Sequence, residues 1–273
     1  STPKPSSAAS DVYKRQVFMS DKILNNFLMH YVHNMAIYRH ENTSIYYEDS
    51  GEDLPALLLI APGGMKSALS FWKGTPWDPR EHLKGRYRII AMDQRNAGSS
   101  TAEISGKDSW HTYTADQLGL MDYLSIPRFH VAGMCIGGPY CLGLIEAASD
   151  RVISGTLFQS IGLDKNRDAF YAMFDDWAYE LKSKMPEVSS TAWAGFRENM
   201  YGGNKVLFNV DELFISACTT PLLVLMGDDL YHPRSTSLML SKTAQNVELI
   251  ESWKEGKSRD DAIIQCLQFL QRN

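Results

Sequence analysis

The sequence predicts an α/β domain with a mostly parallel central sheet flanked by helices. Short apolar runs bounded by turn residues alternate with segments of helical periodicity along most of the chain. Continuous apolar runs are typical of strands that are buried on both faces, as in parallel sheets. Strands that alternate with helices also imply right-handed crossovers. The 273 residues suit one large domain, or one domain with an insertion.

The expected elements begin at residue 35. A hairpin is predicted first, from strands at 35–38 and 44–48. Core strands are predicted at 56–60, 87–92, 129–134, 152–158, 222–226 and 247–250. Helices are predicted at 114–124, 138–148, 235–244 and 259–271. We therefore expect residues 35–160 and 218–273 to form the core, with 161–217 inserted as a helical lid.

The N-terminal end is expected to stand apart from this domain. Residues 1–10 are rich in Ser, Pro and Ala, and residues 11–16 look like the conceptual translation of a sequencing adaptor. Residues 1–16 are therefore interpreted as an assembly artefact. Residues 17–34 have apolar side chains at helical spacing, which suits either an amphipathic helix or a translated leader. We interpret 1–34 as a non-native or leader segment.

The composition excludes several classes of protein. Hydrophobic residues make up 44% and charged residues 22%, with a net charge of −5, which excludes a disordered chain and argues against nucleic-acid binding. The longest purely apolar run, 56–61, is far shorter than the roughly 18 residues of a membrane helix. We therefore expect neither nucleic acid nor membrane as a partner.

The four cysteines suggest a reducing environment. Cys135, Cys141, Cys218 and Cys266 form no C-x-x-C pair and no cluster suited to zinc. This spacing, together with the lack of a recognisable secretory signal, favours a cytoplasmic location and a reactive rather than a bridged cysteine. No metal or other cofactor is expected, because the chain has no phosphate cradle or dinucleotide motif.

The strongest chemical motif is Gly133-Met134-Cys135-Ile136-Gly137-Gly138. It follows a predicted strand and opens a predicted helix. Glycine two residues before and two after Cys135 permits a sharp turn that exposes the central side chain and aims the next backbone N–H at the same point. The helix N-terminus favours the thiolate form of Cys135. The remaining cysteines are interpreted as core residues.

From residue 35 to the C-terminus the sequence resembles the α/β-hydrolase superfamily. The motif around Cys135 is similar to the elbow of the cysteine-nucleophile branch, which includes dienelactone hydrolases. Residues 61–65 (Ala-Pro-Gly-Gly-Met) look like the loop that supplies an oxyanion-hole N–H, and 93–99 looks like the loop after the next strand. The resemblance implies Cys135 as nucleophile, with an oxyanion hole formed by Ile136 and by Gly64 or Met65.

The segments for the acid and the base resemble those of the family less closely. In the segment 227–233 the family's acid precedes a proline by four positions, which selects Asp229 over Asp228. The family's histidine follows the last strand, but no histidine follows His232 here, and Lys257 stands at the expected place. Three alternatives remain open for the base. The base is His232, whose imidazole titrates near neutral pH, or it is His111, or the protein has no base. Lys257 could act as a base only if it were strongly desolvated.

The predicted lid has an aromatic bias. It holds ten of the chain's thirty aromatic residues, and Phe170, Phe174, Trp177 and Leu181 share one helical face. That face either packs the insertion onto the core or walls an apolar substrate pocket.

Together these features predict hydrolysis of a small ester or lactone-type acyl bond in a small, apolar substrate. Cys135, Asp229 and His232 are the expected catalytic residues. Because the usual histidine is absent, the alternatives are a non-catalytic binding protein of the same fold and an acyltransferase. The sequence does not identify the substrate or the oligomeric state.

Overall fold

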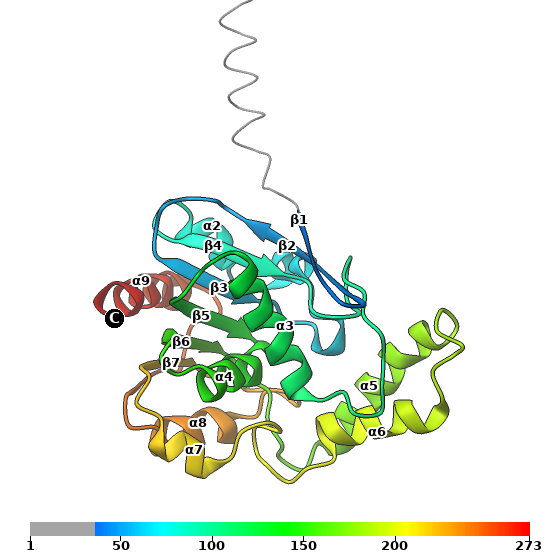
Figure 1. The fold of residues 1–273 in the computed structure, drawn as a ribbon. Helices are drawn as coiled ribbons and strands as arrows, with labels where there is room; N and C mark the ends of the chain where they lie inside the picture. Colours follow the sequence, from blue (N-terminus) through cyan, green and yellow to red (C-terminus); the bar gives the residue numbers. More distant parts are fainter. Residues whose placement is uncertain (1–35) are drawn as a thin grey trace, which may run out of the picture. The chain divides into compact units, whose positions relative to one another are not determined.

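The computed structural model describes residues 36–273, and its centre is an eight-stranded sheet. The strands are β1 (Ala36–His40), β2 (Thr43–Asp49), β3 (Ala56–Ile60), β4 (Arg88–Met92), β5 (Phe129–Met134), β6 (Val152–Phe158), β7 (Leu222–Leu225) and β8 (Val247–Ile250). Their order across the sheet is β1-β2-β4-β3-β5-β6-β7-β8 (Figure 1). Pairs β1–β2 and β2–β4 are antiparallel and the other five are parallel, so the predicted mostly parallel sheet is confirmed. The interpretation of residues 1–34 lies outside the described residues.

Helices connect the strands. They are the 3-10 helices η1 (Gly64–Lys66) and η2 (Leu69–Gly74), and the α-helices α2 (Pro79–Leu83), α3 (Trp110–Tyr123), α4 (Gly137–Ala147), α5 (Arg167–Lys182), α6 (Ser190–Tyr201), α7 (Glu212–Ala217), α8 (Arg234–Thr243) and α9 (Gly256–Arg272). The predicted βα alternation is present from β4 to α9. Helices α5, α6 and α7 lie between β6 and β7, in the interval 161–217.

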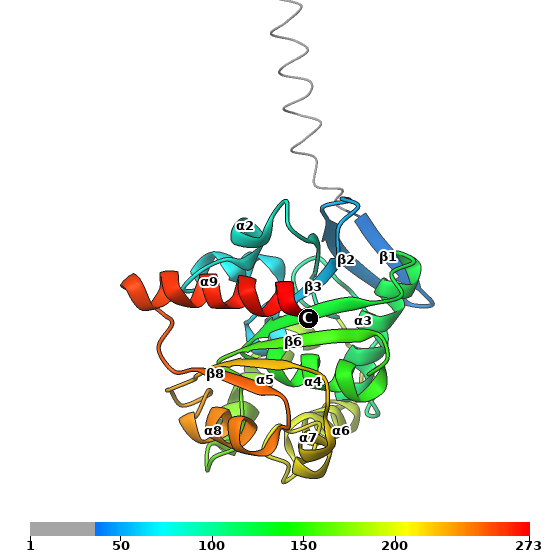
Figure 2. The ribbon, with the colours of Figure 1, turned by 90° about the vertical axis from the view of Figure 1, so that its left-hand side faces the viewer.

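Alternating side chains divide the core into two layers. Along β3, Leu57 and Leu59 belong to the layer that includes Phe269 of α9, whereas Leu58 and Ile60 belong to the layer that includes Tyr140 of α4. A strand buries both faces in this way when helices cover both sides of its sheet. Figure 2 shows α9 and α2 on one side, with α3 and α4 on the other.

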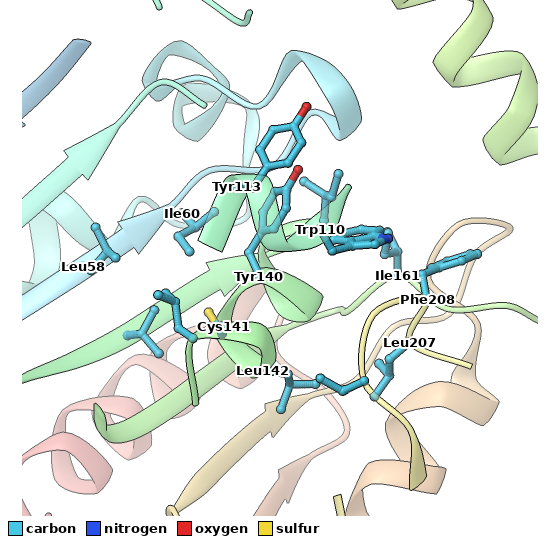
Figure 3. Packing of buried hydrophobic residues seen from close by; sticks show 14 of the residues in the cluster. Leu58, Ile60, Trp110, Tyr113, Tyr140, Cys141, Leu142, Ile161, Leu207 and Phe208 are labelled. Carbon is cyan, nitrogen blue, oxygen red and sulfur yellow. The ribbon is translucent and has the colours of Figure 1, made fainter. Parts of the chain in front are cut away.

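The second layer continues into the segment between β6 and β7. Tyr140 stacks on Tyr113 of α3 with ring centroids 5.0 Å apart, and Trp110 lies 5.1 Å from Tyr140 and 6.2 Å from Phe208 (Figure 3). Offset and edge-on aromatic pairs of this kind add about 0.5–1.5 kcal/mol each beyond area burial. Trp110 also lies edge-on to Tyr201 of α6, with ring centroids 6.0 Å apart, so a helix that follows β6 packs on the core through aromatic rings.

Two local features differ from expectation. Helix α3 begins at Trp110 rather than Thr114, because Ser109 starts the helix and its N–H donates to Thr112 Oγ1 at 3.0 Å. Helix α2 was not expected; the Asp78 side chain caps it by accepting from Arg80 N at 3.0 Å. No helix within residues 36–273 has both the length and the hydropathy needed to cross a membrane.

Candidate active site

Cys135 lies at the sharp turn between β5 and α4. Its φ is 62°, in the left-handed region that non-glycine residues rarely occupy. Such a conformation costs on the order of 1–3 kcal/mol and persists only where neighbouring contacts impose it. Cys135 N–H donates to Phe158 O at 3.0 Å, and Cys135 O accepts from Ile161 N at 3.1 Å and Gly138 N at 3.1 Å. The backbone of the turn is thus held on both sides, while the side chain is half-buried.

Gly133 is required because the helix approaches the strand closely. A Cβ on Gly133 would collide with the backbone of Gly137 and would lie 2.8 Å from Cys141 Sγ. The sequence pattern of glycines two residues before and after Cys135 therefore has a steric cause. Cys141 packs beneath the turn as a fully buried thiol.

Asp229 and His232 lie on one tight loop after β7. His232 Nδ1 is 2.8 Å from the Asp229 carboxylate, and since a carboxylate only accepts, Nδ1 is the donor. The same carboxylate accepts from the backbone N–H groups of Tyr231 and His232, each at 3.0 Å. Partial burial raises the pKa of Asp229, but these bonds and the charge of His232 outweigh it, and the net pKa lies below its ordinary value. The Asp229 carboxylate thus orients the ring of His232 and fixes its tautomer.

The other ring nitrogen of His232 faces the cysteine. Nε2 is buried and makes no hydrogen bond of normal geometry among the described residues, but His232 and Cys135 line the same cavity and interact closely enough for each to shift the pKa of the other. Burial lowers the pKa of His232, but Cys135 and Asp229 together raise it to about 8. Conversely, burial raises the pKa of the Cys135 thiol, and His232 together with nearby backbone N–H groups brings it below its ordinary value. The lowered pKa of the thiol and the raised pKa of the imidazole both favour a thiolate–imidazolium pair.

Two backbone N–H groups point at the Cys135 sulfur. They belong to Ile136, at the start of α4, and to Gly63, in the loop after β3. The sequence predicts Ile136, and on the loop it predicts Gly64 or Met65. The structure instead brings the N–H of Gly63, one residue earlier, to the sulfur.

The difference arises from the backbone of this loop. Gly63 has a φ of 118° and caps η1, a conformation that sequence spacing does not reveal. Gly64 lines the cavity above Cys135. Met65 is buried, and its sulfur accepts from Tyr201 OH at 3.5 Å.

The other candidate bases lie away from Cys135. His111 is exposed on the first turn of α3, and Lys257 is almost fully exposed, 3.7 Å from Asp261. Asp228, the alternative acid, pairs with Lys254. Of the acids and bases weighed from the sequence, the structure brings Asp229 and His232 to the turn at Cys135.

A cavity of about 260 Å³ opens over Cys135 and His232. Phe170 and Met173 of α5 and Tyr231 of the acid loop line it, so the insertion both packs on the core and walls the cavity. This volume lies below the roughly 300–1,000 Å³ of sites for drug-sized ligands. Within residues 36–273 no group of three His, Cys, Asp or Glu side chains is placed to hold a metal ion.

Asn166 holds the loop of Asp229 and His232 and was not predicted from the sequence. Asn166, just before α5, is buried and its Nδ2 donates to Leu230 O at 2.7 Å and to Gly162 O at 3.0 Å. The only sequence signal for Asn166 is a polar residue at a helix start, which is too common to select it.

Two curated proteins with hydrolytic names match part of this chain in sequence. The putative carbamate hydrolase RutD of Azorhizobium caulinodans is 32% identical over 117 residues, which are 42% of this chain and 41% of the relative. A probable proline iminopeptidase of Leptolyngbya boryana is 28% identical over 154 residues, 53% of this chain and 46% of the relative. The matched stretch therefore spans less than half the length of these curated relatives.

Solved structures show a similar fold over more of the chain. The enol-lactonase of Burkholderia xenovorans LB400 has a TM-score of 0.62 at 20% identity, covering 86% of this chain and 100% of its own. A 2-hydroxy-6-oxo-6-phenylhexa-2,4-dienoate hydrolase of a Rhodococcus species also has a TM-score of 0.62, at 19% identity, covering 87% and 99%. The family model described as alpha/beta hydrolase fold matches residues 56–204. Because that match spans more than half of the chain, the protein belongs to the alpha/beta hydrolase fold family.

Proposed function

We propose that the protein hydrolyses a small, uncharged ester or lactone through Cys135. The observation that carries this proposal is the arrangement of His232, whose Nδ1 is held by Asp229 while its ring lines the same cavity as Cys135 and interacts with that thiol. A hydrogen-bonded nucleophile and base, with the base oriented by a third group, is the arrangement that covalent acyl transfer requires. This arrangement differs from the family's usual one, since here acid and base share one loop.

Acylation would start from the thiolate of Cys135 and the imidazolium of His232. The Cys135 thiolate attacks the acyl carbon, and the carbonyl oxygen becomes an oxyanion between the N–H groups of Gly63 and Ile136. Each such donor is typically worth about 3–4 kcal/mol in the transition state. Protonated His232 then gives its Nε2 proton to the departing alkoxide, which leaves as an alcohol. The enzyme retains a thioester on Cys135 and a neutral His232.

Deacylation would reverse these roles. Neutral His232 takes a proton from water, the hydroxide attacks the thioester carbon, and the same N–H groups hold the second oxyanion. Collapse expels the Cys135 thiolate and releases the carboxylic acid, with His232 again protonated. Asp229 stays ionised throughout and stabilises the imidazolium.

The relatives agree with this class of reaction. They include a putative carbamate hydrolase and an enol-lactonase, both of which are named for cleavage of a bond to an acyl carbon. The small apolar cavity supports an uncharged substrate. The rival functions are binding without catalysis and transfer of the acyl group to a nucleophile other than water.

Kinetics on a panel of short-chain esters and lactones test the proposal. Cys135→Ala should abolish turnover, and His232→Ala should reduce kcat by about 10²–10⁴-fold, the usual contribution of a general base. Cys218→Ala and His111→Ala are matched controls, since both residues lie outside the cavity. If wild type and the two site variants are equally inactive on every substrate, the hydrolase proposal is wrong. An acyl-enzyme that forms by mass spectrometry but discharges only to an added amine or thiol would instead indicate an acyltransferase.

A further inference from the structure

A second cavity adjoins the first. It measures about 240 Å³ and shares Gly63, Met173 and Tyr231 with the 260 Å³ cavity over Cys135. These three residues therefore form the boundary between an inner cavity, which contains the nucleophile, and an outer one.

The two cavities differ in chemical character. Ile161 and Phe170 line the inner cavity, and no carboxylate, Lys or Arg side chain is among the described residues around it. Lys66 and Asp176 border the outer cavity. Lys66 pairs with Glu180 at 2.5 Å, so the outer cavity has charged groups of both signs near it. An apolar group gains free energy in the inner cavity, and a polar group keeps its solvation in the outer one.

Met173 is the adaptable part of the boundary. It projects from α5 and is half-buried, and its sulfur lies so close to Gly64 that a Cβ at this position would collide with it. Tyr231 is the fixed part, because its ring packs edge-on against Phe170 at 5.5 Å and its carbonyl accepts from Gly162 N at 3.3 Å. A methionine side chain has three rotatable bonds and fills irregular space.

The scissile bond belongs at this boundary. Gly63 borders both cavities, and its N–H is one of the two that point at the Cys135 sulfur. A carbonyl oxygen held there places one substituent of the acyl carbon in each cavity.

Building on the function proposed above, we propose that Met173 sets the size of the acyl group. The substrate then has a short, uncharged, apolar acyl group in the inner cavity and a more polar leaving group in the outer one. Acyl chains too long for the inner cavity are rejected by the Met173 side chain.

The first test compares p-nitrophenyl esters from acetate to octanoate. Wild type should prefer the short esters, and Met173→Ala should raise kcat/KM for hexanoate and octanoate by about tenfold or more relative to acetate, since a pocket discriminates roughly 10–200-fold per methylene. Met173→Leu keeps the volume and should keep the size limit. Met185→Ala removes a methionine from the same insertion outside both cavities and controls for a general loosening of the fold. A Met173→Ala profile that parallels wild type would overturn the proposal.

The second test needs no turnover. Alkyl methanethiosulfonates transfer an alkylthio group to a thiolate and release methanesulfinate, so the rate of Cys135 modification against alkyl length reports the size of the inner cavity. We expect methyl to react faster than octyl in wild type, and the difference to shrink about tenfold in Met173→Ala. Cys135→Ser identifies the background from other cysteines. If Met173→Ala relaxes the size limit but the protein cleaves no ester, the hydrolase proposal alone is refuted. If the protein cleaves esters but Met173→Ala leaves the size limit unchanged, only the role of Met173 is refuted. If methyl and octyl reagents react equally fast with wild type, the inner cavity does not select by size and the inference fails.

Discussion

The residues Cys135 and His232 carry opposite pKa shifts, and these shifts set the expected pH dependence. The thiol pKa is lowered, so the thiolate forms below the usual pH, and the imidazole pKa is raised to about 8. Alkyl esters need both the thiolate and the protonated imidazole, because the departing alkoxide must receive a proton. We therefore expect kcat/KM for an alkyl ester to rise with pH as the thiol ionises and to fall as pH passes through about 8.

An ester with a different leaving group distinguishes the contribution of the Cys135 thiolate from that of protonated His232. Nitrophenolate leaves without a proton, so the fall near pH 8 should disappear with a p-nitrophenyl ester while the rise remains. The measurement is kcat/KM from pH 5 to 10 for both esters on wild type, with Cys218→Ala as a control. A fall of equal size with both esters would contradict the acid role of His232.

At the residue scale, the sequence could indicate geometry only where a local motif carries it. The glycines around Cys135 enforce a strand-to-helix turn, and the cysteine indeed has a φ of 62° there. The base stayed open among three alternatives, because only tertiary packing decides whether His232 or His111 faces the sulfur. Gly63, whose N–H interacts with the sulfur, was not among the residues singled out from the sequence, because spacing does not reveal the left-handed conformation of this glycine; the choice of Gly64 or Met65 as oxyanion donor stays a prediction. The roles of these residues stay predictions.

At the scale of elements, the start of α5 is connected to the acid loop. Asn166 donates to Leu230 O and Gly162 O, and its own Oδ1 accepts from Asp164 N at 2.8 Å. Ser235, at the start of α8, donates to Asp164 at 2.6 Å. The loop that holds acid and base is thus braced by the segment that leads into the helices over the cavity.

Asn166→Ala should therefore affect the position of His232 more than it affects substrate binding. Removing the amide leaves Leu230 O without its donor, and a buried unsatisfied carbonyl costs about 1–3 kcal/mol unless the loop shifts. We expect kcat to fall about tenfold with KM changed much less, and Cys135 to become less reactive toward iodoacetamide at pH 7. Asn204→Ala, at an exposed position whose side chain accepts from Arg167 at 3.1 Å, is the matched control. An unchanged kcat in a folded Asn166→Ala protein would show that the brace has no bearing on the base.

Among the elements, those with buried apolar runs were predictable. The expected strands at 56–60, 129–134, 152–158 and 247–250 coincide with β3, β5, β6 and β8. The helices between β6 and β7 were expected only as a helical insertion with one aromatic face. Their ends depend on single caps, such as Ser189, which accepts from Ala192 N at 3.1 Å, and periodicity cannot locate such caps.

Across the whole molecule, the two core layers are joined to the insertion by a small number of buried polar contacts. Arg95, in the loop after β4, forms a bidentate pair with Asp116 of α3 at 2.7 and 2.9 Å, and both side chains are about nine-tenths buried. The neighbouring Asn96 O accepts from Trp177 Nε1 of α5 at 3.1 Å. The loop after β4 therefore contacts a core helix and an insertion helix at the same place.

Removing one member of this buried pair should destabilise the whole fold. Asp116→Ala leaves the Arg95 guanidinium buried beside the more distant Asp108 carboxylate, which lies 3.8 Å away. We expect the free energy of unfolding in urea to fall by about 3 kcal/mol, with an unchanged dependence on urea concentration. Asp260→Ala removes an exposed partner of Arg259 and should change it by less than about 1 kcal/mol. Equal stability of the two variants would show that the Arg95 pair contributes no more than a surface contact. A transition that splits into two steps in Asp116→Ala would show instead that the insertion has become able to unfold apart from the sheet, because the loop that couples them no longer holds both.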